Sequence, residues 1–212
     1  MKKISLILIA LCIVGSTTLA NEKYLQKMGE TLQKFKTANS IEELQKVANT
    51  FVTIARAETG EWLPLYYEAH CYIQMSFMDR SGSRDRYLDQ AETSINKLME
   101  LVPEEAEVYA LQAFYHTGRL VINPAERAMT TAPLVSQSLG KALSLDPDNP
   151  RALFIKLSNE MGTAQYFGQD TAPLCEQARN LLENWDSHVP PSPIHPAWGK
   201  ENMEEIVREC AQ

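Results

Sequence analysis

The side chains able to do chemistry in this 212-residue chain are few and widely separated. The four histidines are His70, His116, His188 and His195. Only the last two lie near one another, and a metal site built from His188, His195 and Cys210 would need three ligands that converge from a loop and a helix. We therefore expect no metal site and interpret these side chains as surface polar groups.

Other chemical patterns are weak or missing. The chain has no Gly-rich phosphate loop, nucleophile elbow, His-Glu-x-x-His or Cys-x-x-Cys sequence. Asp146, Asp148 and Asn149 match part of a calcium loop, but the Gly and the distal Glu are missing. The acidic pairs at 104–105 and 204–205 fall in the first turns of expected helices, where they complement the helix dipole. The sequence predicts neither an enzyme nor a cofactor.

Composition describes an ordinary folded chain with an acidic surface. Hydrophobic residues make up 44% and charged residues 22%, which excludes a disordered or low-complexity protein. The formal net charge is −7 and the charges form no long runs, so we expect no nucleic-acid partner.

The first twenty residues have the pattern of an export signal. Lys2 and Lys3 precede the apolar run 4–14, and small side chains at Thr18 and Ala20 precede a polar sequence. This order is typical of a secretory signal peptide cleaved after Ala20. We therefore predict an exported protein, periplasmic or secreted.

A lipid anchor on Cys12 is the alternative, although Leu11 stands where a lipoprotein signal needs a small residue. No later segment approaches 18 uninterrupted apolar residues, so no transmembrane segment is expected after signal cleavage. Export to an oxidising compartment would permit a disulfide among the remaining Cys71, Cys175 and Cys210.

A period of 44 residues organises the rest of the chain. The phrase at 141–150, a helical pattern that ends in Asp-Pro-Asp-Asn-Pro, has a counterpart at 97–105. Apolar residues recur at the same offset, as in Ala91, Ile95 and Leu98 with Val135, Leu139 and Ala142, and in Leu65 and Ala69 with Tyr109 and Ala113. The recurrence predicts a repeat protein.

Each repeat has the periodicity of two helices. Leu25, Met28, Leu32 and Phe35 form one apolar stripe, and Ser40 with Glu43 gives a capping-box pattern before the next stripe. We predict antiparallel helix pairs at roughly 22–38 with 40–57, 62–78 with 85–101, 105–121 with 132–145, and 150–166 with 171–186.

These features resemble the tetratricopeptide repeat (TPR) family. The resemblance lies in residues expected at helix contacts and in the sequence Leu-Asp-Pro-Asp-Asn-Pro at 145–150, which ends a helix. The contact residues are Ala69, Tyr72, Ala91, Ala113 and Ala142. It covers 60–186 well and 21–59 weakly. It implies an all-α, right-handed solenoid of about four antiparallel pairs in a repeat domain at 21–186, completed by a Pro-rich segment and a C-terminal capping helix at 187–212.

The sequence departs from the TPR family in its period, which is 44 rather than about 34 residues. The extra residues, at 79–85 and 122–131, are expected to be loops that project from one edge of the solenoid. HEAT-like repeats have a similar period but usually lack this Asp-Pro-Asp-Asn-Pro exit.

The C-terminal region changes character after Trp185. Four prolines between 186 and 196 exclude a helix there, so this part should lie extended over the surface. Residues 193–201 resemble the C-terminal signature of small exported TPR proteins of Gram-negative bacteria. We expect Trp198 to pack where a further repeat would dock, and so to close the end of the stack.

Two cysteines occupy apolar helix faces that we expect to meet. Cys175 lies on the stripe of the last paired helix, and Cys210 shares a face of the terminal helix with Met203 and Ile206. This placement predicts a Cys175–Cys210 disulfide, with two buried free thiols as the alternative. Cys71 is interpreted as a core thiol, because no neighbouring sequence supplies an activating base.

The resemblance also implies a binding surface. In TPR proteins the first helices of the pairs line a concave groove, and the matching exposed positions here are Tyr66, His70, Glu107, Ala110, Phe114, Arg151, Phe154 and Ser158. The main hypothesis is a non-catalytic protein–protein interaction adaptor that binds an unidentified peptide or partner helix. The alternatives are a small-ligand carrier or enzyme that uses the groove and the inserted loops, and a self-associating structural repeat. Phe114 and Phe154 could also simply pack against neighbouring helices.

Overall fold

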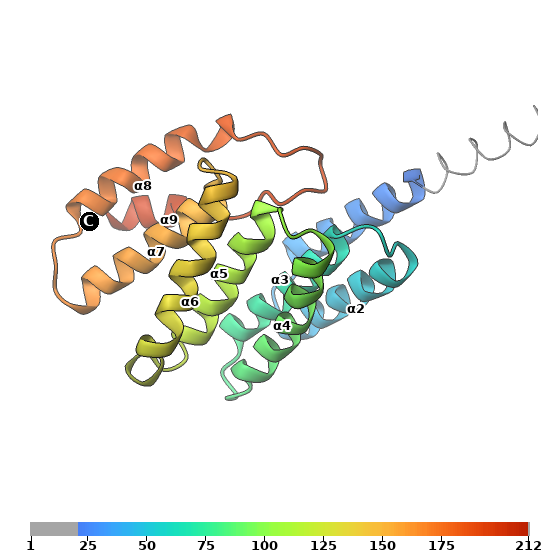
Figure 1. Ribbon diagram of the computed structural model, residues 1–212, viewed down its shortest axis with the longest axis horizontal. Coiled ribbons are helices and arrows are strands. Elements are labelled where there is room, and N and C mark those ends of the chain that lie inside the picture. Colours follow the sequence, from blue (N-terminus) through green and yellow to red (C-terminus); the bar gives the residue numbers. More distant parts are fainter. Residues whose placement is uncertain (1–20, 212) are drawn as a thin grey trace, which may run out of the picture.

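The computed structural model describes residues 21–211, and this part of the chain is all helical, with no strand (Figure 1). The predicted signal peptide and the alternative anchor at Cys12 lie outside the described residues. The first described helix covers residues 21–37. The elements that follow are α2 (Ile41–Ala57), α3 (Leu63–Met78), α4 (Arg84–Leu101), α5 (Ala106–Leu120), α6 (Pro124–Leu145), α7 (Pro150–Tyr166), α8 (Ala172–Asn184), the 3-10 turn η1 (Trp185–Ser187) and α9 (Lys200–Glu209).

Local sequence explains where the helices begin. The Ser40 side chain accepts a hydrogen bond from the Glu43 backbone at 3.2 Å, and the Glu43 carboxylate accepts one from the Asn39 backbone. These contacts satisfy donors that the first turn of α2 would otherwise leave free. Asn149 caps α7 in the same way, with Pro150 in the first turn, where its missing N–H costs nothing.

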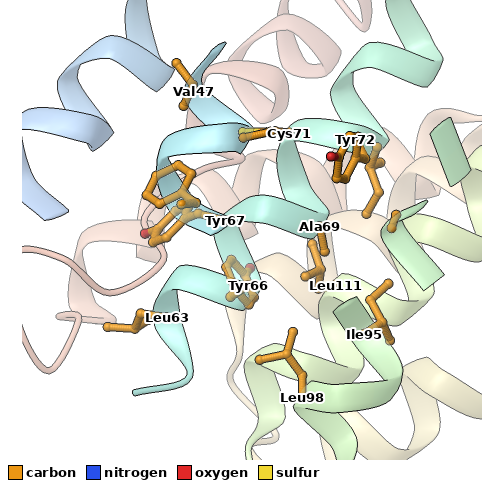
Figure 2. Packing of buried hydrophobic residues seen from close by; sticks show 14 of the residues in the cluster. Val47, Leu63, Tyr66, Tyr67, Ala69, Cys71, Tyr72, Ile95, Leu98 and Leu111 are labelled. Atoms are coloured by element: carbon orange, nitrogen blue, oxygen red, sulfur yellow. The ribbon is translucent and has the colours of Figure 1, made fainter. Parts of the chain in front are cut away.

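The helices pack in order along the chain. Each contacts the next one, and α3, α5 and α7 also contact one another in succession. Residues matched by the 44-residue period are buried at these contacts, among them Ala69, Ala113 and Leu157. Figure 2 shows part of the larger apolar cluster, in which Tyr66 and Leu111 lie between successive helix pairs. The prediction of an all-α fold is therefore confirmed for residues 21–211.

The second inserted segment is helical, and the prediction of a loop at 122–131 was wrong. Helix α6 begins at Pro124, so most of the insert extends it at its N-terminal end. Pro124 suits a first helical position, and the following Ala, Glu, Arg and Met residues favour a helix. The first insert contains a true loop, because α4 does not begin until Arg84.

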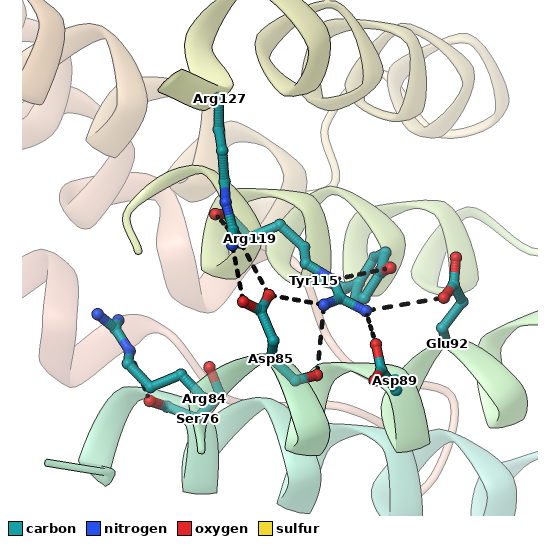
Figure 3. Close-up of polar contacts among 8 residues, drawn as sticks. All are labelled: Ser76, Arg84, Asp85, Asp89, Glu92, Tyr115, Arg119 and Arg127. Atoms are coloured by element: carbon teal, nitrogen blue, oxygen red, sulfur yellow. Dashed lines mark hydrogen bonds and ion pairs between the residues drawn. The ribbon is translucent and has the colours of Figure 1, made fainter. Parts of the chain in front are cut away.

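Ion pairs connect the additional N-terminal turns of α6 to the neighbouring helices (Figure 3). We call this the charged cluster; it consists of Asp85, Asp89, Glu92, Arg119 and Arg127. Both oxygens of Asp85 accept hydrogen bonds from Arg127, at 2.7 and 2.8 Å, and Arg119 contacts Asp85 at 2.7 Å and also Asp89. The cluster joins α4, α5 and α6 at one edge of the molecule.

Among residues 21–211, none of the helices has the length and hydrophobicity that a membrane crossing requires.

Candidate ligand groove on the inner face

The C-terminal segment, residues 188–210, lies across the face formed by α3, α5 and α7, which we call the inner face. The Trp198 indole donates a hydrogen bond to the Tyr66 hydroxyl at 2.8 Å and stacks on Phe114, with ring centroids 5.2 Å apart. A third ring, Phe154, meets Trp198 edge-on at 6.3 Å. Trp198 therefore contacts all three helices and does not close the end of the stack as we had predicted.

Two features hold this segment in place. The Tyr67 hydroxyl donates a hydrogen bond to the backbone carbonyl of Ile194 at 3.1 Å, and the Ile194 side chain is buried. Gly199 then turns the chain into α9 with a φ of +103°, and a Cβ there would lie 3.0 Å from the Trp185 ring. Only glycine combines that backbone conformation with so close an approach.

The eight residues that the resemblance assigned to an exposed groove are not exposed. They are Tyr66, His70, Glu107, Ala110, Arg151 and Phe154, which are buried, and Phe114 and Ser158, which are half-buried. The expectation of an exposed set was wrong because the chain covers this face with its own C-terminal segment. Four of the eight meet Trp198, and Ser158 only bonds within its own helix.

Beneath this cover lies a buried ion pair between α5 and α7. Arg151 donates to Glu107 through Nε at 2.6 Å, and the Asn149 amide donates to the same carboxylate at 2.6 Å. The two charged side chains are only 3% and 9% exposed. Burial alone would lower the pKa of Arg151, but its hydrogen bonds to Glu107 raise it above the ordinary value. The Arg151 guanidinium is therefore held in its charged form beside the Glu107 side chain.

A groove of about 630 Å³ opens beside this cover, between the 21–37 helix, α3 and the C-terminal segment. Its lining includes the rings of Phe35, Tyr67, His70, His195 and Trp198. Known ligand sites are typically concave, mainly apolar and roughly 300–1,000 Å³ in volume. The size and the ring-rich but partly charged lining therefore suit a flat ligand that carries both apolar and polar groups.

His70 is the unusual polar group of this groove. It is fully buried, with Phe35 at 5.0 Å and Trp198 at 4.8 Å between ring centroids, and burial lowers its pKa to about 3. The Gln74 amide nitrogen lies 3.3 Å from Nε2. The other ring nitrogen, Nδ1, is shielded from solvent and has no hydrogen-bond partner among the described residues. His70 therefore supports the floor of the groove as a buried polar ring.

Charged groups lie along the groove lining as well. Lys36 comes from the 21–37 helix, and Lys200, Glu201 and Glu204 come from the start of α9. The Lys200 ammonium is 2.7 Å or less from both oxygens of Asp186, so part of its charge is already neutralised. Lys36 is a cation available to a ligand carboxylate from the opposite side.

The predicted disulfide is confirmed. Cys175 on α8 and Cys210, directly after α9, form a disulfide with Cα atoms 5.7 Å apart. Cys71 is a free, buried thiol on α3, as the sequence indicated, and burial raises its pKa well above the ordinary value.

The remaining sites offer less chemistry. A groove of about 510 Å³ borders the charged cluster, and one of about 640 Å³ lies among α6, α7 and the start of α8. No group of three His, Cys, Asp or Glu side chains in residues 21–211 is placed to hold a metal ion. His188 lies near Asp146, while His195 bonds to Ser192 at 2.7 Å, so these two histidines do not share a site.

Sequence reasoning missed most of the groove. Phe35, Lys36 and Tyr67 carried no signal beyond helical periodicity, because nothing local indicates what faces them. The one usable signal was the Pro193–Trp198 phrase, which we assigned to capping of the stack.

The fold and the groove together define an all-helical binding protein, stabilised by a disulfide as exported proteins commonly are. No protein-family model matches the chain, and no curated protein matches it. A solved structure that is similar to it is the HusA haemophore from Porphyromonas gingivalis, with a TM-score of 0.77 and 26% sequence identity over 88% of this chain and 92% of that one. That neighbour is a binding protein rather than an enzyme.

Proposed function

We propose that this protein is an exported carrier that binds a flat tetrapyrrole of the haem type in the inner-face groove. The observation that carries the proposal is the ring-lined groove, in a chain whose fold is similar to that of a haemophore. This favours the small-ligand alternative of the sequence analysis over the peptide-binding adaptor.

The groove has the chemistry that such a ligand needs. Aromatic side chains such as Phe35 and Trp198 present flat faces and edges to a macrocycle and favour offset-stacked or edge-to-face contacts. The exposed Lys36 side chain can pair with a carboxylate at the edge of the ring.

The adaptor hypothesis loses support from the position of the C-terminal segment. A partner peptide would have to displace Trp198 and Ile194, which already fill the inner face with hydrogen bonds and ring contacts. We keep the TPR-like, right-handed solenoid as part of the proposal. The contacts among α3, α5 and α7 and the 44-residue period support this solenoid. The disulfide supports a periplasmic or secreted location.

The test is a titration of the oxidised protein with haemin and with iron-free protoporphyrin IX. We expect saturable binding of one molecule, seen as a shift of the porphyrin absorbance and as quenching of tryptophan fluorescence. Phe35→Ala should weaken the affinity by about tenfold, or ~1.4 kcal/mol, because it removes a ring from the groove.

The matched control is Tyr166→Ala, which removes an exposed ring at the end of α7, outside the groove. Its affinity should equal that of the unchanged protein. An absence of saturable binding, or equal losses in both variants, would contradict the proposal.

A further inference from the structure

The C-terminal segment forms a wall of the groove that is separate from the helical stack. More than half of the residues that line the groove belong to 193–204, and the others come from the 21–37 helix, Ala38 directly after it, α2 and α3. Displacement of this segment would therefore remove one side of the site and leave the helix pairs that carry the other side unchanged.

The wall has little structure of its own. Residues 188–199 contain no helix. Two hydrogen bonds that involve side chains join them to α3, from the Tyr67 hydroxyl to the Ile194 carbonyl and from the Trp198 indole to the Tyr66 hydroxyl. Helix α9 has ten residues, which is shorter than an isolated helix needs to be stable in water. Its buried contact is Met203, so α9 forms only while it is docked on α8 and its neighbours.

The disulfide closes this wall at its far end. Cys210 follows α9 directly, and Cys175 lies on α8, so the whole segment is enclosed in a covalent loop with a sequence separation of 35. Without the bond, the segment would be covalently attached to the protein only at its N-terminal side, after η1, and held otherwise by its hydrogen bonds and buried side chains. Cys210 is half-buried whereas Cys175 is buried, so Cys210 is the more exposed of the two cysteines.

We propose that the Cys175–Cys210 disulfide controls retention of the ligand by holding this wall closed; the inference rests on the proposed carrier function. A dithiol reductant attacks the Sγ of Cys210 and forms a mixed disulfide, with Cys175 leaving as a thiolate. The second thiol of the reductant then releases Cys210. The protein gains two electrons and two protons as two thiols, and the reductant becomes a disulfide. The wall detaches, and the ligand dissociates.

Iron-free protoporphyrin IX is the probe, because a reductant cannot change the oxidation state of an iron that is not present. Its affinity is measured by fluorescence titration for the oxidised protein, for the protein reduced with dithiothreitol, and for the double variant Cys175→Ser, Cys210→Ser. We expect both treatments to weaken binding by at least about tenfold, while helix content by circular dichroism changes little. The matched control, Cys71→Ser, should bind like the oxidised protein.

Hydrogen exchange separates this proposal from the carrier function. Reduction should speed amide exchange in 190–209 and leave α3 to α6 unchanged, whether or not a porphyrin binds. If the oxidised protein fails to bind while exchange in 190–209 rises on reduction, the carrier function is wrong and the wall is still held by the disulfide. Equal affinities before and after reduction, or unchanged exchange in 190–209, would overturn the proposal.

A second variant guards against a double mutant that does not fold. Tyr67→Phe removes the hydrogen bond to Ile194 and keeps the disulfide. It should weaken porphyrin binding less than reduction does, since the covalent loop still holds the segment near the groove. A larger loss from Tyr67→Phe than from reduction would mean that the disulfide does not control retention.

Discussion

Two sets of charges join successive helix pairs, and they differ in almost every physical respect. The Glu107–Arg151 pair lies beneath the C-terminal segment and is almost completely shielded from water. The charged cluster lies at the other end of α5, where the Asp85 side chain is 44% exposed. The buried pair occupies equivalent positions 44 residues apart, which the pairs of the cluster do not.

The difference shows what each set contributes. A buried charge that loses its partner stays in a medium of low polarity. Removal of the partner therefore lowers the free energy of unfolding strongly, even when the intact pair adds little net stability. Exposed ion pairs are screened by water and salt, and each contributes little. The inner face therefore depends on complete pairing, whereas the outer edge tolerates change.

The largest expected effect follows from removal of one buried partner. Arg151→Met should lower the free energy of unfolding by about 3–5 kcal/mol, because Glu107 is left buried and unpaired. The measurement is urea denaturation at neutral pH. The control is Glu107→Leu with Arg151→Met, which removes both charges and should recover much of the loss. A double variant as unstable as Arg151→Met would show that packing, and not the orphaned charge, causes the effect.

An intermediate effect should come from pH, again on the inner face. The pKa of His70 is lowered to about 3, so the unfolded chain binds a proton below about pH 6.5 while the folded chain does not. Stability should therefore fall as the pH drops from 6.5 towards 3, by at most ~1.4 kcal/mol per pH unit. His70→Phe should flatten this dependence in urea denaturation measured between pH 7 and pH 4. An unchanged slope would mean that other groups cause the acid sensitivity.

The smallest effect is expected at the charged cluster. Hydrogen bonds from Arg127, with further contributions from Arg119, lower the pKa of Asp85 to about 2. Its contribution is present above the ordinary carboxyl pKa and is lost as the pH falls from about 4 towards 2. Because Asp85 is partly exposed, Asp85→Asn should cost under ~1 kcal/mol, and less at high salt. If Asp85→Asn lowered the free energy of unfolding as much as Arg151→Met does in parallel measurements, the two regions would not differ as described.

Local patterns were enough to predict the helices and the disulfide, but they could not place the groove. Apolar spacing located the helix pairs, and the helix faces of Cys175 and Cys210 indicated their pairing. The loop predicted at 122–131 was wrong because residues in excess of the TPR period were assigned to a loop, whereas Pro124 occupies the first turn of a longer α6. The position of Trp198 could not be inferred, because it depends on contacts with residues more than a hundred positions earlier.

Those distant contacts also determine when the groove can form during synthesis. Tyr67 and Tyr66 bond to residues 127 and 132 positions later in the chain. The helix pairs, by contrast, join near neighbours and can assemble before the C-terminal residues are synthesised. A chain that lacks its last twenty residues would keep its helix pairs but lack one side of the groove, so the groove is complete only after the last helix has docked.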